Sequence, residues 1–165
     1  MKISMIVAMD KNNAIGNNGK LLWHIPKDLK WMKEQTMGHV IVMGRNSYSD
    51  IITYTKGKPL PGRTNVVITS QNSNFHPDFV ILHSIEDVLT KYSKEDKIFI
   101  LGGGAIYNSF LPLADELIIT HVDAEFEADT FFPKFNYSEF KITFEEENKE
   151  NGFNFKFVKY EKKKT

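Results

Sequence analysis

The chain of 165 residues contains no cysteine, which excludes disulfide bonds, thiolate metal sites and cysteine nucleophiles. It carries no excess charge, because 21 lysines and arginines balance 21 acidic residues, so no overall field favours nucleic acid or a membrane surface. No apolar run approaches the roughly 20 residues that span a bilayer. The five histidines show no spacing typical of metal ligands. We therefore expect a cytoplasmic protein with neither a metal site nor a nucleic-acid or membrane partner.

What the chain does contain is ordinary for a globular protein, with 41% hydrophobic residues and 13 phenylalanines to fill a core. At this length we expect one domain, which we place at residues 1–162, with residues 163–165 as a frayed, solvated tail. Residues 3–9 form a short apolar run that passes into Asp10 without a convincing cleavage site. This run predicts a buried strand rather than a signal peptide.

Short β-type runs alternate with helical patterns along the chain. They predict strands at residues 3–9, 40–43, 65–69, 79–82, 97–101 and 116–122, and helices from Pro26, at 44–51, at 85–92 after a Ser84 N-cap, and at 105–111. Residues 10–20 are interpreted as a polar loop. Residues 139–147 and 153–161 alternate in polarity and predict an antiparallel hairpin joined by residues 148–152. The expected fold is a single-domain α/β fold, with a mostly parallel central sheet of about eight strands, flanking helices and a C-terminal antiparallel hairpin.

Asp28 is an acid on the apolar side of a short helix. Pro26 suits the first helical turn, because its missing N–H would have no helical partner there. A helix that starts there places Asp28 on one face with Trp31 and Met32, at i+3 and i+4. Beside an indole and a thioether the carboxyl loses water and its pKa should rise, which suits it to bind a protonated heterocycle or to manage a proton. The simpler alternative is that Asp28 only favours the helix dipole.

Three strand ends carry groups that suit a phosphate. Residues 102–104 are all glycine and lie between a strand and a helix, where the backbone can approach a diphosphate closely, although a tight turn explains them equally well. Arg45 and Ser47 start another helix after a strand, and Thr69 and Ser70 end a third strand. Each is an ordinary residue when taken singly, but ligands of open α/β sheets bind at the carboxyl ends of the strands.

A rigid Pro-Leu-Pro-Gly turn at residues 59–62 holds Arg63 next to a strand. The functional interpretation of Arg63 is a clamp for a carboxylate, and the simpler one is solubility. The segment Asp-Thr-Phe-Phe-Pro at residues 129–133 follows an acidic run that would otherwise be interpreted as an exposed loop.

In order and spacing these pieces resemble the dihydrofolate reductase family. The matching pieces, which span residues 3 to about 161, are Ile15-Gly16, Trp23, Pro26-Lys27-Asp28, Thr36-Met37-Gly38, Met43-Gly44-Arg45, Pro59-Leu60-Pro61-Gly62-Arg63, Gly102-Gly103-Gly104-Ala105-Ile106-Tyr107 and Asp129-Thr130-Phe131-Phe132-Pro133. The resemblance implies reduction of 7,8-dihydrofolate to tetrahydrofolate by hydride transfer from NADPH, in support of one-carbon metabolism. It also implies a monomer that binds antifolate inhibitors.

The resemblance implies roles around the substrate. Asp28 would hold the pterin through its ring N3 and 2-amino group and assist protonation at N5, while hydride reaches the adjacent C6. Trp23 and Thr36 would fix a water and the hydrogen-bond network of Asp28, and Arg63 would clamp the α-carboxylate of the substrate glutamate. The other implied substrate-binding residues are Ile6, Ala8, Leu29, Met32, Ile51, Leu101 and Thr120.

For NADPH, the resemblance implies phosphate contacts from Arg45, Ser47 and Ser70. Glycines 102–104 would pass under the diphosphate and the nicotinamide, with a cis bond between Gly102 and Gly103. Tyr107 would face the nicotinamide carbon that gives up hydride, and with Asp28 and Trp23 it completes the implied catalytic set. The other implied cofactor-binding residues are Ala8, Ile15, Gly16, Gly44, Asn46, Thr69, His83, Ala105, Ile106 and Thr130.

The chain departs from the family pattern at several positions. Leu22 stands where proline is usual and Ala128 where glycine is frequent, so loop closure should persist with changed rates. Ala105 stands where some relatives carry an Arg, which leaves the NADPH preference to Arg45, Ser70 and His83. Residues 52–56 look like an insertion.

Two other functions fit the residues less well. A related reductase acting on a pyrimidine ribosylamine is disfavoured by the combination of Asp28, Trp23 and Arg63. A nucleotide- or pterin-binding module without chemistry is disfavoured by the intact Asp28.

Overall fold

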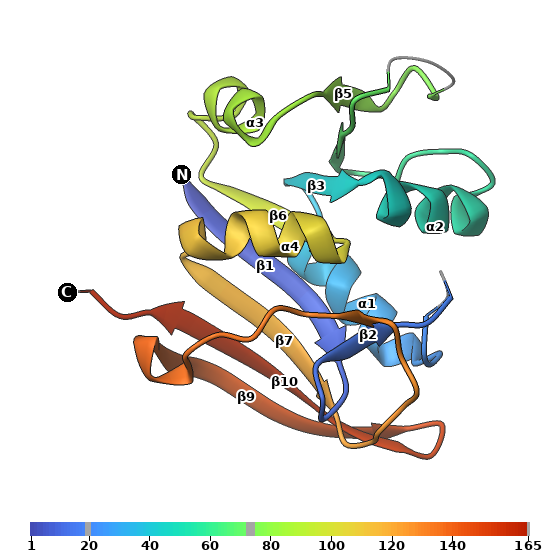
Figure 1. Ribbon diagram of the computed structural model, residues 1–165, viewed down its shortest axis with the longest axis vertical. Helices are drawn as coiled ribbons and strands as arrows, with labels where there is room; N and C mark the ends of the chain where they lie inside the picture. The colour runs from blue at the N-terminus through green and yellow to red at the C-terminus, as the bar shows by residue number, and fades with distance from the viewer. Residues whose placement is uncertain (19–20, 72–74, 165) are drawn as a thin grey trace.

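The computed structural model describes residues 1–18, 21–71 and 75–164. It contains an eight-stranded sheet in the order β5-β4-β3-β6-β1-β7-β10-β9 (Figure 1). The neighbours from β5 to β7 are parallel, and β10 and β9 continue the sheet antiparallel. These strands are β1 Lys2–Met9, β3 Val40–Gly44, β4 Thr64–Ile68, β5 Val80–Leu82, β6 Lys97–Gly102, β7 Glu116–Val122, β9 Phe140–Glu150 and β10 Phe153–Lys162. The predicted fold class is confirmed.

Helices cover both faces of the sheet. Helix α4 crosses one face, and α1 lies behind the other (Figure 1). Two short 3-10 helices, at Leu111–Leu113 and Tyr137–Glu139, complete the helical elements of the described residues. None of the helices in the described ranges is both long enough and apolar enough to cross a membrane. The α-helices are α1 Pro26–Thr36, α2 Arg45–Thr55, α3 Ile85–Lys91 and α4 Gly104–Phe110.

The parallel strands contribute side chains to two hydrophobic cores, one on each face of the sheet. On β3, Val40 and Val42 belong to the core that α3 and α4 cover, whereas Ile41 and Met43 belong to the core that α1 and α2 cover. Side chains alternate across a strand, so a strand buried on both faces must be apolar throughout. This is why the central strands could be predicted as continuous apolar runs.

Most predicted elements lie within one residue of their observed bounds, and Ser84 caps α3 by accepting from the Asp87 amide at 3.1 Å. The end predicted for the second helix is wrong. Helix α2 continues past residue 51 to Thr55, and Lys56 then ends it in the left-handed region with φ 57°. Residues 52–55 of the suspected insertion are therefore the last turn of this helix.

The interpretation of residues 10–20 as a loop is also wrong in part, and residues 19–20 lie outside the described residues. Residues Ala14–Gly16 form strand β2, which pairs antiparallel with β8, Thr130–Phe131. Strands of three and two residues are too short to show an alternating pattern, and their pairing joins segments that are far apart in the chain.

The C-terminal hairpin is confirmed, but its turn is shorter than predicted. Strand β9 continues to Glu150, and only Asn151 and Gly152 form the turn, with φ of 52° and 80°. Two residues with positive φ are typical of a tight type I′ turn, for which Asn-Gly is the favoured sequence. Beyond β10, the Lys163 amide still donates to the Glu139 carbonyl at 2.8 Å.

Candidate active site

Asp28 lies in the first turn of α1, which begins at Pro26 as predicted. Its Oδ1 accepts a hydrogen bond of 2.6 Å from the hydroxyl of Thr120, on β7. Burial raises the pKa of Asp28 above its usual value of 3.8, and the bond from Thr120 opposes that rise because it favours the charged form. The raised pKa that the sequence predicts is confirmed.

An aromatic stack closes the space between α1 and the sheet. The Trp31 ring lies parallel to Phe157, with centroids 4.4 Å apart, and stacks on Phe144 at 5.6 Å. The Lys159 ammonium lies 5.5 Å from the Trp31 ring. The buried Trp31 Nε1 has no hydrogen-bond partner in the part of the chain that the structure describes. The stack therefore helps to keep water away from the helix face that carries Asp28.

Arg63 reaches the end of α1. Its Nη1 donates to the Thr36 hydroxyl at 3.1 Å, and its Nε donates to the Pro61 carbonyl at 3.0 Å. The Thr36 hydroxyl in turn donates to the Met32 carbonyl at 2.7 Å. Partial burial lowers the pKa of Arg63, but a guanidinium stays charged at neutral pH. The hydroxyl that bonds Asp28 thus belongs to Thr120, and Thr36 orients Arg63.

The structure also brings together predicted apolar site residues from four elements. One core contains Ile6 of β1, Met32 of α1, Ile51 of α2 and Leu101 of β6. Other predicted pocket residues lie beside this group, because Leu29 follows Asp28 on α1 and Ala8 is the register partner of Thr120. Trp23 packs its ring against Phe126 at 5.5 Å, and no direct hydrogen bond joins it to Asp28 among the described residues.

The carboxyl ends of β3 and β6 lie side by side, where Met43 pairs with Gly102. The bond between Gly102 and Gly103 is cis, as the resemblance implies. A Cβ on Gly44 would lie 2.7 Å from Cγ1 of Ile106, so only glycine lets the start of α2 approach α4 this closely. The Ser47 hydroxyl lies 3.9 Å from the place of a Cβ on Gly103. Both glycine turns and the first turn of α2 therefore border one site, with Arg45 and Asn46 exposed beside it.

Tyr107, on α4, contacts the backbone of two strands at this edge. Its hydroxyl lies 2.8 Å from each of the Ile6 and Leu101 carbonyls and can donate its single proton to only one of them at a time. Burial, with a smaller contribution from the charge of Asp28, raises the pKa of Tyr107 so that the phenol stays protonated. The hydroxyl therefore ties β1 to β6.

Two further groups of predicted cofactor residues border the same edge. Thr69 and Ser70 follow β4, and the His83 Nδ1 lies 2.6 Å from the Thr69 carbonyl oxygen. The Arg45 guanidinium lies 5.4 Å from the ring of Phe75, in the segment that leads to β5. These contacts place β4, β5 and the first turn of α2 around one exposed surface.

The ribbon of β2 and β8 meets the start of α4. The methyl carbon of Thr130 lies 3.5 Å from the place of a Cβ on Gly104. The Asp129 amide donates to the Gly16 carbonyl at 3.1 Å, and the Asn18 amide donates to Oδ2 of Asp129 at 2.9 Å. The predicted residues of this group are Ile15, Gly16 and Thr130 on the ribbon and Ala105 and Ile106 on α4.

Sequence reasoning missed two carboxylates that fix the surrounding loops. Asp10 is 2% exposed, and its oxygens accept from the amides of Asn12, Ala14 and Phe126 at 2.8 to 2.9 Å. Glu150, at the end of β9, accepts from the Lys27 amide at 2.8 Å. The contacts with the Phe126 and Lys27 amides each reach over more than a hundred residues, and nothing in the local sequence signals them.

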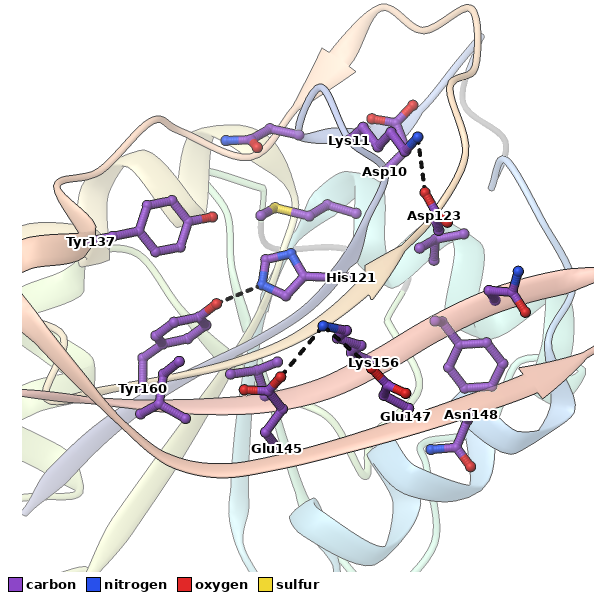
Figure 2. A pocket seen from close by; sticks show the side chains of 17 residues that line it. Asp10, Lys11, His121, Asp123, Tyr137, Glu145, Glu147, Asn148, Lys156 and Tyr160 are labelled. Carbon is purple, nitrogen blue, oxygen red and sulfur yellow. Dashed lines mark hydrogen bonds and ion pairs between the residues drawn. The ribbon is translucent and has the colours of Figure 1, made fainter.

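A hollow of about 780 Å³ lies between β7, β9, β10 and the loop after β1, and Asp28 is not among its lining residues (Figure 2). It is lined by His121, whose Nε2 lies 2.8 Å from the Tyr160 hydroxyl, and by Lys156, which pairs with Glu145 and Glu147. Thr120 and His121 point to opposite sides of the strand, so the hollow is separate from the site around Asp28. Within the described ranges no group of three His, Asp or Glu residues could hold a metal ion.

Comparisons with known proteins agree on one family. A family model described as dihydrofolate reductase matches residues 2–162. The dihydrofolate reductase of Bacillus subtilis (strain 168) is 38% identical over 164 residues, which are 98% of this chain and 95% of that protein. The dihydrofolate reductase of Haemophilus influenzae is 36% identical over 161 residues, which are 96% of this chain and 97% of that protein. A solved structure, dihydrofolate reductase from Enterococcus faecalis complexed with NADP(H) and RAB-propyl, matches with a TM-score of 0.88 and 30% identity, covering 99% of this chain and 97% of that chain.

Proposed function

Because the chain belongs to the dihydrofolate reductase family, we propose how its own residues serve the reduction of 7,8-dihydrofolate to tetrahydrofolate with NADPH. The cofactor supplies the hydride, while the protein supplies binding, orientation and electrostatics. The observation that carries the proposal is the carboxyl group of Asp28, which shares a helix face with Trp31 and Met32, has a raised pKa and is held by Thr120.

Asp28 binds the pterin and manages the proton of the reaction. Its carboxylate accepts from ring N3 and the 2-amino group of the pterin, because two parallel N–H donors suit a carboxylate. One proton must reach N5 while hydride reaches the adjacent C6. The raised pKa brings the carboxyl nearer to the pH of use, where it assists that protonation. Trp23, which packs in the same core cluster as Trp31, would help to fix a water at Asp28.

The rest of the substrate lies along the apolar pocket and ends at Arg63. The guanidinium binds the α-carboxylate of the glutamate, since the two N–H groups of Nη2 make no hydrogen bond in the described part of the chain. The Thr36 hydroxyl and the Pro61 carbonyl hold the Arg63 guanidinium in place for this contact. We expect antifolate inhibitors to compete for the same pocket, whose walls are Ile6, Ala8, Leu29, Met32, Ile51, Leu101 and Thr120.

The edge formed by β3, β4 and β6 fits NADPH because it combines cationic and hydroxyl donors with two glycine turns. Arg45, Ser47 and Ser70 would hold the phosphates, aided by the positive end of α2. Glycines 102–104 would let the diphosphate and nicotinamide approach the backbone closely, and the Tyr107 hydroxyl supports that backbone at the Leu101 carbonyl. The remaining residues that we assign to cofactor binding are Ala8, Ile15, Gly16, Gly44, Asn46, Thr69, His83, Ala105, Ile106 and Thr130.

The test is dihydrofolate-dependent oxidation of NADPH by the purified protein and by its Asp28→Asn variant. We expect turnover of the variant to fall by about 100-fold or more at pH 7, because positioned proton transfer contributes about that much. The loss should be smaller at pH 5, where solution protonates the substrate. Glu34→Gln, which removes an exposed charge from the same helix, is the matched control and should retain wild-type turnover.

An Asp28→Asn variant as active as the wild type at pH 7 would remove Asp28 from the mechanism. Binding of NADPH without any turnover of dihydrofolate by the wild type would instead support a binding module. The monomeric state, the cytoplasmic location and the domain boundary at residue 162 also stay predictions.

A further inference from the structure

Helix α1 begins without a cap of its own. Its N-cap residue is Ile25, which has no side-chain acceptor, and Pro26 follows it. A helix start leaves several backbone N–H groups without partners, and a polar side chain at the N-cap normally accepts from one of them. Since Asp28 lies in this first turn, any fraying of the turn would move the carboxyl group of the site.

The missing acceptor comes from the tip of the C-terminal hairpin. Oε1 of Glu150 accepts from the Lys27 amide at 2.8 Å, and Nδ2 of Asn151 donates to the His24 carbonyl at 3.1 Å. Two contacts from adjacent residues thus bracket the entry into α1. A carboxylate at this end of a helix is also stabilised by the helix dipole.

The same hairpin supports the residue that holds Asp28. On β10, Phe157 is the register partner of Thr120, whose hydroxyl bonds the Asp28 carboxylate. Phe157 also stacks on Trp31, one turn further along α1. The body of the hairpin therefore fixes Thr120 and the middle of α1, while its tip fixes the start of α1.

We propose that Glu150 is a positioning residue for the reaction, which caps α1 through the Lys27 amide and so holds Asp28 against Thr120. Glu150 acts through the helix and touches neither substrate nor cofactor. The inference rests on the proposed role of Asp28. It adds a requirement that the hairpin tip be in place for Asp28 to bind the pterin.

Three variants separate the capping contact from the charge. Glu150→Ala removes both, Glu150→Gln keeps an acceptor oxygen without the charge, and Glu146→Ala is the control. Glu146 is an exposed carboxylate of the same strand that bonds only the nearby Asn148 side chain among the described residues. The steady-state constants for dihydrofolate and for NADPH are measured for each variant, with thermal unfolding to confirm that each is folded.

We expect Glu150→Ala to lower kcat/KM for dihydrofolate by roughly threefold to tenfold, the range that follows from the loss of a helix cap. The KM for NADPH should stay within about twofold, because the cap does not reach the cofactor edge. Glu150→Gln should recover most of the loss, and Glu146→Ala should match the wild type. If Glu150→Ala is no slower than Glu146→Ala, the proposal is overturned.

The double variant Asp28→Asn/Glu150→Ala tests whether the effect passes through Asp28. Residues that act as a unit have non-additive effects, so the double variant should be no slower at pH 7 than Asp28→Asn alone. Effects that multiply would show a general structural role for Glu150 and overturn the proposal. An unchanged rate of Asp28→Asn itself would overturn the proposed role of Asp28, which makes the two failures distinguishable.

Discussion

At the scale of single residues, two opposed influences set the state of Asp28. Burial disfavours its charge, whereas the Thr120 hydroxyl donates to the charged form. Burial is the larger of the two, so the carboxyl keeps a raised pKa and a fixed orientation at the same time. The role that we propose for Asp28, which is to bind the pterin and to assist its protonation, needs this combination.

Thr120→Val tests the hydrogen bond from Thr120 to Asp28, because valine has a similar shape and no hydroxyl. Without the donor the charged form of Asp28 is less favoured, so the pKa of Asp28 should rise further. Turnover is expected to fall as Asp28 loses its proton. The pH at which it falls should therefore be higher in Thr120→Val than in the wild type. The measurement is the pH profile of kcat/KM for dihydrofolate.

The matched control for this prediction is Thr36→Val, whose lost hydroxyl serves the Met32 carbonyl and Arg63. This variant should raise the KM for dihydrofolate through Arg63 and leave the position of the pH profile unchanged. A profile that moves equally in both variants would show that the Thr120 contact is not specific to Asp28.

At the scale of elements, the turn after β6 depends on close packing against α4. Gly102 has φ of +102°, and a Cβ there would lie 2.6 Å from the ring of Tyr107. Tyr107 cannot retreat without releasing the carbonyls of Ile6 and Leu101. The end of β6, the start of α4 and the end of β1 are therefore one packed unit.

Gly102→Ala should destabilise the protein more than positive φ alone explains. Gly57 also has positive φ, at +87°, but a Cβ there would meet nothing within 4 Å. We expect Gly57→Ala to lower the free energy of unfolding by about 1 kcal/mol, the cost of left-handed backbone. Gly102→Ala should cost about 3 kcal/mol or more, because it also breaks the buried bond of Tyr107. Urea denaturation of both variants checks this, and equal losses would contradict the packing argument.

The sequence predicts the elements whose residues follow a local rule. Continuous apolar runs marked the central strands, and Pro26 and Ser84 marked helix starts. Asp28 was found for the same reason, since its neighbours at i+3 and i+4 lie on one helix face. The ribbon of β2 and β8 and the cap from Glu150 have no such signal, because each joins a few residues that are distant in the chain. The β2–β8 ribbon and the Glu150 cap are stabilised by tertiary contacts, which cannot be predicted from a local sequence pattern.

At the scale of the whole molecule, the candidate site and a cluster of charged side chains lie at opposite ends of the central strands. Glu116 lies at the start of β7, is 6% exposed, and accepts from the Ser4 hydroxyl at 2.7 Å. Lys97 and Lys2 contact its carboxylate at 3.1 and 3.5 Å from the starts of β6 and β1. The cluster thus joins the amino ends of three neighbouring strands, while the ligands are expected at their carboxyl ends. Stability at this end should be separable from activity at the other.

Glu116→Gln tests that separation through the pH dependence of stability. Burial disfavours the charge of Glu116, but the Ser4 hydroxyl and the two lysines outweigh it and hold its pKa below the usual value of 4.5. A group whose pKa is lowered by folding contributes stability that is complete above its unfolded pKa and is lost as the pH falls through its folded pKa. The wild type should therefore lose this stability below about pH 4.5, and Glu116→Gln should lack that part of the acid dependence.

At pH 7 the variant should be less stable by about 1 to 3 kcal/mol, because it loses hydrogen bonds to a charged group. Urea denaturation between pH 3 and pH 8 measures both effects. Glu145→Gln is the control, since its pair with Lys156 is exposed and should contribute little. Asp28 cannot produce the same signal, because its pKa is raised by folding and it therefore adds stability as the pH falls. If the free energy of unfolding falls equally with pH below 4.5 in Glu116→Gln and the wild type, Glu116 is not the source of this acid dependence. An unchanged kcat in a less stable Glu116→Gln would show that stability at the amino ends of the strands is independent of activity at their carboxyl ends.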